Sequence, residues 1–269
     1  MTLVVSLRVP DGVVLAADSL QTTQATIIPG LKDFKTACPK CSEEITLEKI
    51  QMPPIQMPMS TSSYAQKLFP FTKKFGAASF GSGIVNNRTI YYQMKILEKS
   101  LSEESIVSVS EAADKILEYF DEELKKELKN RNLDIASAPE DFYPFGFQIV
   151  GYETDQDVSG KTIEVLIGKK SIKRDIEGIG CTVSGDRQVV AKLWELREED
   201  PRFSTNFGSF SLQDAIDYAE FLIRTTAMHQ RFSNMIPTVG GAVDIALVTT
   251  HSGFSWIKFK KLTKILEEI

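Results

Sequence analysis

Apolar residues dominate both faces of the N-terminal stretch, and this pattern predicts a buried β-hairpin. Residues 3–9 and 13–18 are two runs rich in Val, Leu and Ala. Pro10-Asp11-Gly12 joins them and favours a turn, because Pro presets φ and Gly permits a positive φ. Since both faces of these runs are largely apolar, we expect strands that lie between two layers rather than against water.

Short apolar runs and helical spacings predict the remaining elements. Strands are predicted at 67–71, 75–80, 145–152, 161–167, 171–174, 179–183, 242–250 and 253–259. Helices are predicted at 84–99, 109–128, about 186–199, from Ser211 onward, and over the polar residues 260–269. The pairs Ser108 with Glu111 and Ser211 with Asp214 mark two of the helix N-termini.

The order of these elements predicts an α+β fold. Strand pairs, two helices, more strand pairs, two more helices and a last hairpin favour a four-layer αββα sandwich of two stacked antiparallel sheets with helices outside. At 269 residues we expect a single domain, 1–269. Residues 23–66 break the pattern with Pro, Cys and Met, so we interpret them as an insertion in that domain.

Composition and charge indicate a globular protein and argue against some classes of partner. With 42% hydrophobic and 25% charged residues, the chain is typical of globular proteins. Its 31 Lys and Arg against 36 Asp and Glu give a net charge of −5, which argues against a nucleic-acid partner. No apolar run is long enough to predict a membrane span. Three cysteines and no recognisable secretory signal favour the cytoplasm.

Thr2 is the first candidate for chemistry. A penultimate residue this small normally allows removal of Met1, which would leave Thr2 with a free α-amine. A hydroxyl needs an adjacent base to act as a nucleophile, and an N-terminal threonine carries that base on its own Cα. With a pKa of about 8, an α-amine is neutral often enough at pH 7 to accept the proton.

Thr2, the strand 3–9, the Asp11-Gly12 turn and the strand that ends at Asp18 resemble the opening of proteasome β-subunits. HslV peptidase and the bacterial ancestral β-subunit belong to the same family of N-terminal nucleophile hydrolases. Four later stretches resemble further motifs of this family and follow in the same order along the chain: Lys67-Leu68-Phe69, 75–83, Val183-Ser184-Gly185 and 240–246. An α-type subunit would begin with an extra helical segment, so the β type is favoured.

The resemblance implies a role for each matching residue. Thr2 would be both nucleophile and base, Lys67 would tune the site, and Asp18 would hold Lys67. The Gly81 N–H would face the oxyanion, and Ser184 would hydrogen-bond the Thr2 amine.

The resemblance also implies a substrate pocket near Ser79 and Thr22. An ungapped count from Asp18 places the family's lysine near Lys32 and Lys35 instead, but Lys67 precedes the strand pair that leads into Gly81. Where many members of the family carry an acid and a serine before the late double glycine, this chain has Ile236-Pro237-Thr238-Val239.

Cys38-Pro39-Lys40-Cys41 supplies half of a zinc site, because a structural tetrahedral site needs four ligands. Zinc shared between two subunits, a redox pair and a turn that binds nothing are three interpretations of this motif. Cys181 is expected to be a small core residue. His229 and His251 have no ligand spacing, and His229 is expected to be structural.

We therefore expect a threonine-type amide hydrolase that needs no cofactor for catalysis. The resemblance implies a homo-oligomeric ring that sequesters the site and acts on peptides or unfolded proteins. No nucleotide-binding motif occurs, so any ATPase would be a separate protein. Two alternatives keep the same fold: a weak or inactive ring or assembly subunit with zinc bridged by Cys38 and Cys41, and an amidase for a small substrate.

Overall fold

The computed structural model describes residues 2–27, 35–37, 44–46, 55–101, 106–133, 139–154, 156–157, 159–234 and 236–261. Their contacts divide the chain into two compact units. The first unit contains Met1–Gln21 and Ser62–Ile269, and the second contains Thr22–Thr61. The predicted insertion 23–66 falls largely in the second unit, and the helix predicted over 260–269 falls almost entirely outside the described residues.

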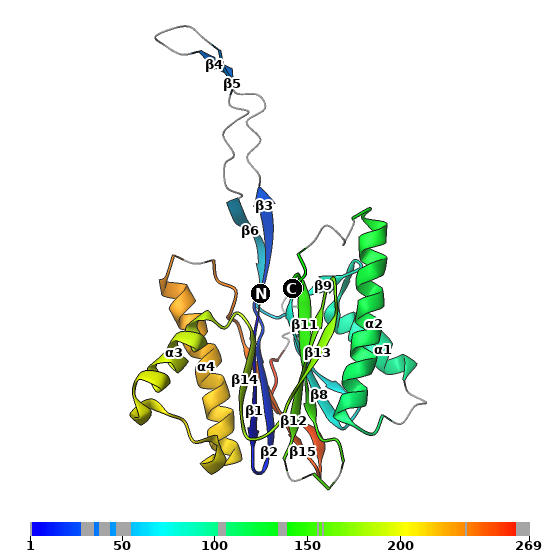
Figure 1. The fold of residues 1–269 in the computed structure, drawn as a ribbon, viewed down its shortest axis with the longest axis vertical. Coiled ribbons are helices and arrows are strands. Elements are labelled where there is room, and N and C mark those ends of the chain that lie inside the picture. Colours follow the sequence, from blue (N-terminus) through cyan, green and yellow to red (C-terminus); the bar gives the residue numbers. More distant parts are fainter. Residues whose placement is uncertain are drawn as a thin grey trace, which may run out of the picture. The chain divides into compact units, whose positions relative to one another are not determined.

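The first unit contains two five-stranded antiparallel sheets (Figure 1). One sheet has the order β14 (Gly180–Gly185), β1 (Leu3–Val9), β2 (Gly12–Asp18), β15 (Val243–Thr249) and β16 (Gly253–Lys258). The other has the order β13 (Ile172–Ile176), β12 (Lys161–Ile167), β11 (Phe145–Gly151), β8 (Phe75–Gly81) and β7 (Leu68–Phe71). The N-terminal hairpin and the other predicted strands form, with ends that shift by at most two residues.

The helices are α1 (Ile90–Ser100), α2 (Val109–Asn130), α3 (Gln188–Glu199) and α4 (Leu212–Phe232). Two 3-10 turns, η3 (Pro201–Phe203) and η4 (Phe207–Ser209), join α3 to α4. The prediction of a helix from residue 84 was wrong, because β9 (Ile84–Val85) and β10 (Arg88–Thr89) form a small hairpin first. Asn86 and Asn87 turn that hairpin with φ of 49° and 59°, a conformation that asparagine tolerates better than most residues.

Three apolar clusters hold the layers of the first unit together. One packs α1 and α2 against the sheet that contains β8, and a second packs α3 and α4 against the sheet that contains β1. The third lies between the two sheets and includes Val4, Leu15, Ala78 and Phe80. Each sheet therefore has one face against helices and one against the other sheet (Figure 1). The chain is a mixed α+β protein with antiparallel sheets, as predicted.

Polar side chains also bridge the two sheets. The hydroxyls of Ser6 on β1 and Thr162 on β12 lie 3.0 Å apart. Buried Arg8 donates from Nη1 to the Thr162 hydroxyl at 2.9 Å and to the Thr182 hydroxyl at 2.8 Å, and from Nε to the Gly178 carbonyl at 2.7 Å. These bonds satisfy a guanidinium that would otherwise be costly to bury.

The second unit contains strands that the sequence pattern did not predict. β3 (Gln21–Ile27) pairs with β6 (Ile55–Ser62), and β4 (Lys35–Ala37) pairs antiparallel with β5 (Glu44–Thr46). The Thr-rich sequence of β3 has a high β propensity, which was a usable signal.

Two helix N-termini were predicted from capping pairs. One of these pairs forms a complete capping box, in which each residue's side chain accepts from the other's backbone N–H. The Asp214 N–H donates to Ser211 Oγ at 3.2 Å, and the Ser211 N–H donates to Asp214 Oδ2 at 2.9 Å. Ser108 accepts from the Glu111 N–H at 3.1 Å, but the Glu111 carboxylate accepts from Val107 instead of closing the box.

The Ser211 cap leads to a prediction about stability. Ser211→Ala leaves an N–H of α4 without its acceptor, so we expect the free energy of unfolding to fall by about 1 kcal/mol in urea denaturation. Ser211→Thr keeps the acceptor and is expected to lose less than about 0.5 kcal/mol. Equal losses in the two variants would contradict a capping role for the hydroxyl.

Candidate active site

Thr2 lies directly before β1 and is 3% exposed. Leu3 and Val5 pack toward the helices, whereas Val4 packs between the two sheets. Because side chains alternate along a strand, Thr2 shares the face of Val4 and is directed toward the other sheet.

The Asp18 carboxylate lies at the end of β2, 1% exposed, and binds four groups. Its Oδ1 accepts from the Leu3 N–H at 3.0 Å and from Lys67 Nζ at 3.0 Å. Its Oδ2 accepts from the N–H groups of Leu20 at 3.1 Å and Gly240 at 2.9 Å. Asp18 thus fixes the backbone immediately after Thr2 and holds Lys67 beside it.

Lys67 lies just before β7 and is 6% exposed. Besides Asp18, its Nζ donates to the Leu20 carbonyl. The structure therefore brings Thr2, Asp18 and Lys67 to one place, although they are far apart in sequence. Of the two other candidates, Lys32 lies outside the described residues and Lys35 is on β4 in the second unit.

Burial dominates the electrostatics of this ion pair. Loss of solvation raises the pKa of Asp18, and the Lys67 charge and the backbone N–H donors oppose that shift. Loss of solvation likewise lowers the pKa of Lys67, and Asp18 opposes that shift. The attraction between the two charges and the backbone donors therefore oppose the cost of burying the pair.

Gly81 ends β8 with φ of +89°. A Cβ there would lie 2.5 Å from the Pro144 carbonyl oxygen, so only glycine fits. Ser79, two residues earlier, is buried, and its N–H donates to the Lys67 carbonyl at 2.8 Å. The strand predicted to carry the oxyanion donor is therefore bonded directly to the segment that carries the lysine.

Ser184 is buried on β14, but its hydroxyl is bonded to the other sheet. It donates to Glu164 Oε1 at 2.6 Å and accepts from Gln148 Nε2 at 2.7 Å. In the β1–β14 register Ser184 is opposite Val4, and the register ends with Leu3 opposite Gly185. The residue next to Thr2 is Asp186, whose N–H donates to the Thr2 carbonyl at 2.8 Å.

Sequence reasoning missed Asp186 and two residues that bind it. Asp186 Oδ2 accepts from Gln230 Nε2 at 2.9 Å and from the Thr238 hydroxyl at 2.5 Å. Gln230 continues the buried stripe of α4 that includes Leu222 and Thr226, at spacings of four residues. A glutamine in an apolar helical stripe is a signal for a buried polar contact.

Gly185 allows β14 to approach Thr2 closely, which leads to a second prediction about stability. Its φ is +89°, and a Cβ there would lie 1.9 Å from the Thr2 carbonyl oxygen. Gly178 has φ of +75°, and a Cβ there would meet nothing within 4 Å, so it is the matched control for backbone strain alone. We expect Gly178→Ala to cost about 1 kcal/mol in urea denaturation. Gly185→Ala should cost about 2 kcal/mol more, and equal losses would contradict the close approach.

The remaining sequence candidates lie elsewhere. Thr22 is buried and belongs to the second unit. Cys38 and Cys41 lie outside the described residues, so the zinc prediction is untested. Within the described ranges, no three or more His, Cys, Asp or Glu side chains form a group that could hold a metal ion. Cys181 packs against the cluster beneath α3 and α4. His229 is exposed near the end of α4.

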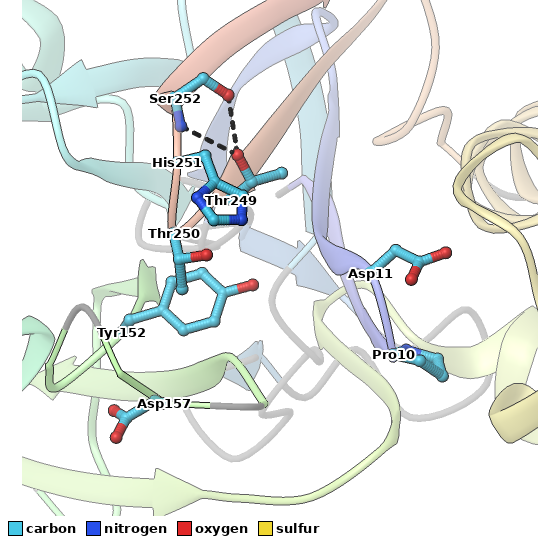
Figure 2. Close-up of a pocket in the computed structure, with 8 residues that line it drawn as sticks. All are labelled: Pro10, Asp11, Tyr152, Asp157, Thr249, Thr250, His251 and Ser252. Carbon is cyan, nitrogen blue, oxygen red and sulfur yellow. Dashed lines mark hydrogen bonds between the residues drawn. The ribbon is translucent and has the colours of Figure 1, made fainter.

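A cavity of about 450 Å³ lies at the opposite end of β1 from Thr2 (Figure 2). It is lined by the turn residues Pro10 and Asp11, by Tyr152 and Asp157, and by residues 249–252. β1 spans seven residues, so roughly 23 Å of strand separates this cavity from Thr2. The cavity is therefore separate from the candidate active site.

Comparison with models of known protein families gives no match, and no curated protein is significantly similar to the chain. Among the described residues, no helix is both long and apolar enough to cross a membrane.

Proposed function

We propose that this chain is an N-terminal threonine amide hydrolase of the proteasome β type, with the αββα fold of N-terminal nucleophile hydrolases. The observation that carries the proposal is the buried Asp18–Lys67 ion pair bonded to the backbone next to Thr2. Burying an ion pair costs solvation free energy and adds little to stability. Its position beside a candidate nucleophile therefore supports a functional role.

The proposed reaction begins with attack by Thr2 Oγ on an amide carbonyl carbon while the Thr2 amine takes the hydroxyl proton. The Lys67 charge favours the developing alkoxide, and the Gly81 N–H faces the oxyanion. Breakage of the C–N bond releases the amine product, which receives the proton. Water then hydrolyses the ester on Thr2 and restores the hydroxyl. These steps need no cofactor.

The substrates we propose are peptides or unfolded proteins, which reach the site inside a homo-oligomeric ring in the cytoplasm. A ring would exclude folded proteins from a nucleophile that has no selectivity of its own. A separate ATPase would supply unfolded chains. Zinc bridged by Cys38 and Cys41 belongs to the alternative, in which the chain is a weak or inactive ring or assembly subunit.

Covalent labelling of the purified full chain tests the proposed function. Intact mass should show that Met1 is absent, and a threonine-directed peptide electrophile should add once and map to Thr2. Material that retains Met1 in every copy, or that labels elsewhere, would contradict the proposal. That outcome would favour the assembly subunit, in which Thr2 has no free amine.

A further inference from the structure

One oxygen of the Asp186 carboxylate has no hydrogen-bond partner within the part of the chain that the structure describes. The side chain is 5% exposed, and Oδ2 accepts from Gln230 and Thr238. Oδ1 is buried without a hydrogen bond among the described residues. A buried carboxylate oxygen without a donor loses its hydration and gains no hydrogen bond in return. A hydrogen-bond donor that is absent while Met1 is present and appears after its removal would satisfy this oxygen.

The position of Asp186 indicates which donor that is. Its N–H donates to the Thr2 carbonyl at 2.8 Å, so the two residues are adjacent across β1 and β14. Gly185 makes this approach possible because its missing side chain leaves room for the Thr2 carbonyl. Removal of Met1 would turn the Thr2 amide nitrogen into an amine, which in its protonated form has three N–H donors.

We infer that Asp186 is a positioning residue for the Thr2 α-amine, with Oδ1 accepting a hydrogen bond from that amine once Met1 is removed. This inference rests on the proposed function. During attack the amine takes the hydroxyl proton and becomes an ammonium, and a carboxylate beside it stabilises that cation. No atom of Asp186 reacts with the substrate.

A single short segment connects Asp186 to Asp18. Gln230 Oε1 accepts from the N–H groups of Thr238 at 2.9 Å and Val239 at 3.0 Å. The next residue, Gly240, donates to Asp18 Oδ2 at 2.9 Å. Thr238, in the segment that departs from the family pattern, therefore binds the Asp186 carboxylate, and the adjoining Gly240 binds Asp18. The acid expected before the double glycine is replaced by one from the end of β14.

The charged groups around the Thr2 amine determine whether its pKa is raised or lowered. Asp186 favours the ammonium and raises the pKa of the amine, whereas Lys67 favours the neutral amine. The Asp18 carboxylate is bonded to Lys67, and Glu164 on β12 is bonded to Ser184. Buried Lys260, which is paired with Asp244, lowers the pKa of Lys67 and so belongs to the same group of charges. Arg187, His229 and Arg231, which are close to Asp186 and Gln230 in sequence, are exposed.

Titration of the amine tests this inference. The pKa of the Thr2 amine is measured by competitive acetylation of the processed full chain across pH, mapped to Thr2. Asp186→Asn keeps the shape but removes the charge, so we expect the amine pKa to fall by about one unit. The pH midpoint of electrophile labelling should fall with it, and the limiting rate should fall about tenfold. Asp11→Asn removes an exposed carboxylate at the far end of β1 and should change neither value.

A second variant covers the case in which Asp186→Asn does not fold. Thr238→Val removes one donor to Oδ2 while the Asp186 charge remains, so the limiting rate should fall with a smaller change in amine pKa. An amine pKa that is the same in wild type, Asp186→Asn and Thr238→Val would overturn the inference even if Thr2 is labelled normally. A shifted amine pKa without electrophile labelling would support the positioning role and overturn the proposed function.

Discussion

Replacing Thr2 by alanine is expected to abolish covalent labelling by a threonine-directed electrophile. The variant keeps a small penultimate residue, so Met1 should still be removed and the amine should still be present. Only the nucleophilic oxygen is missing. Loss of a nucleophile that acts as a unit with its base lowers catalysis by at least about a thousandfold. The labelling rate of the purified chain, followed by intact mass, measures this loss.

Thr2→Ser is the control for that experiment. Serine keeps both the hydroxyl and the α-amine, so we expect labelling to persist at a reduced rate. Circular dichroism should show that both variants fold, because Thr2 lies at the end of β1 rather than within its ladder. Undiminished labelling of Thr2→Ala would assign the reaction to another residue.

Lys67→Met is expected to reduce both stability and labelling. It leaves the buried Asp18 carboxylate without its cation, which we expect to lower the free energy of unfolding by about 3 kcal/mol at pH 7. The labelling rate should fall about a hundredfold or more, because no cation remains to favour the alkoxide. Urea denaturation and labelling kinetics measure the two effects separately.

The stability loss in Lys67→Met should depend on pH. Without Lys67, the folded-state pKa of Asp18 rises further above its unfolded value of about 3.9. A raised folded-state pKa means that the folded chain binds the proton more tightly, so stability is retained below about pH 4 and lost as pH rises. The difference from wild type should therefore be smaller at pH 4 than at pH 7.

Lys260→Met is the comparison variant, because Lys260 forms a second buried ion pair with Asp244. The Lys260 charge lowers the pKa of Lys67, so its removal favours the charged form of Lys67. The variant should lose similar stability at pH 7, yet label Thr2 at nearly the wild-type rate under conditions where it is folded. Equal loss of labelling in the two variants would show that Lys67 matters only for folding.

Local patterns were sufficient to predict most of the first unit. The strands from residue 67 onward and the capping pair at Ser211 follow from periodicity and turn chemistry, which depend on near neighbours. The hairpin 84–89 was missed because its apolar residues also fit a helical spacing. Of the strands in the second unit, β6 was missed because Pro and Met residues obscured its alternation, and β4 and β5 because they are three residues each.

Long-range register explains what could not be predicted of the candidate site. Thr2 follows from its own chemistry, while Asp18 and Lys67 needed the resemblance because 49 residues separate them. Ser184 was predicted from the resemblance of Val183-Ser184-Gly185, and Asp186 was missed because only the pairing of β1 with β14 places it next to Thr2. A one-residue difference in that pairing changes which side chain is next to Thr2.

The bridge formed by Ser6, Arg8 and Thr162 constrains the geometry of the candidate active site. Thr2 and Asp18 belong to one sheet, whereas Ser79 and Gly81 belong to the other. Apolar contact between sheets has no preferred direction and would tolerate sliding. Hydrogen bonds between side chains are directional, so the bridge opposes translation of one sheet along the other. Side-chain hydrogen bonds in the middle of the strands thereby set the spacing between the proposed nucleophile Thr2 and the proposed oxyanion donor Gly81.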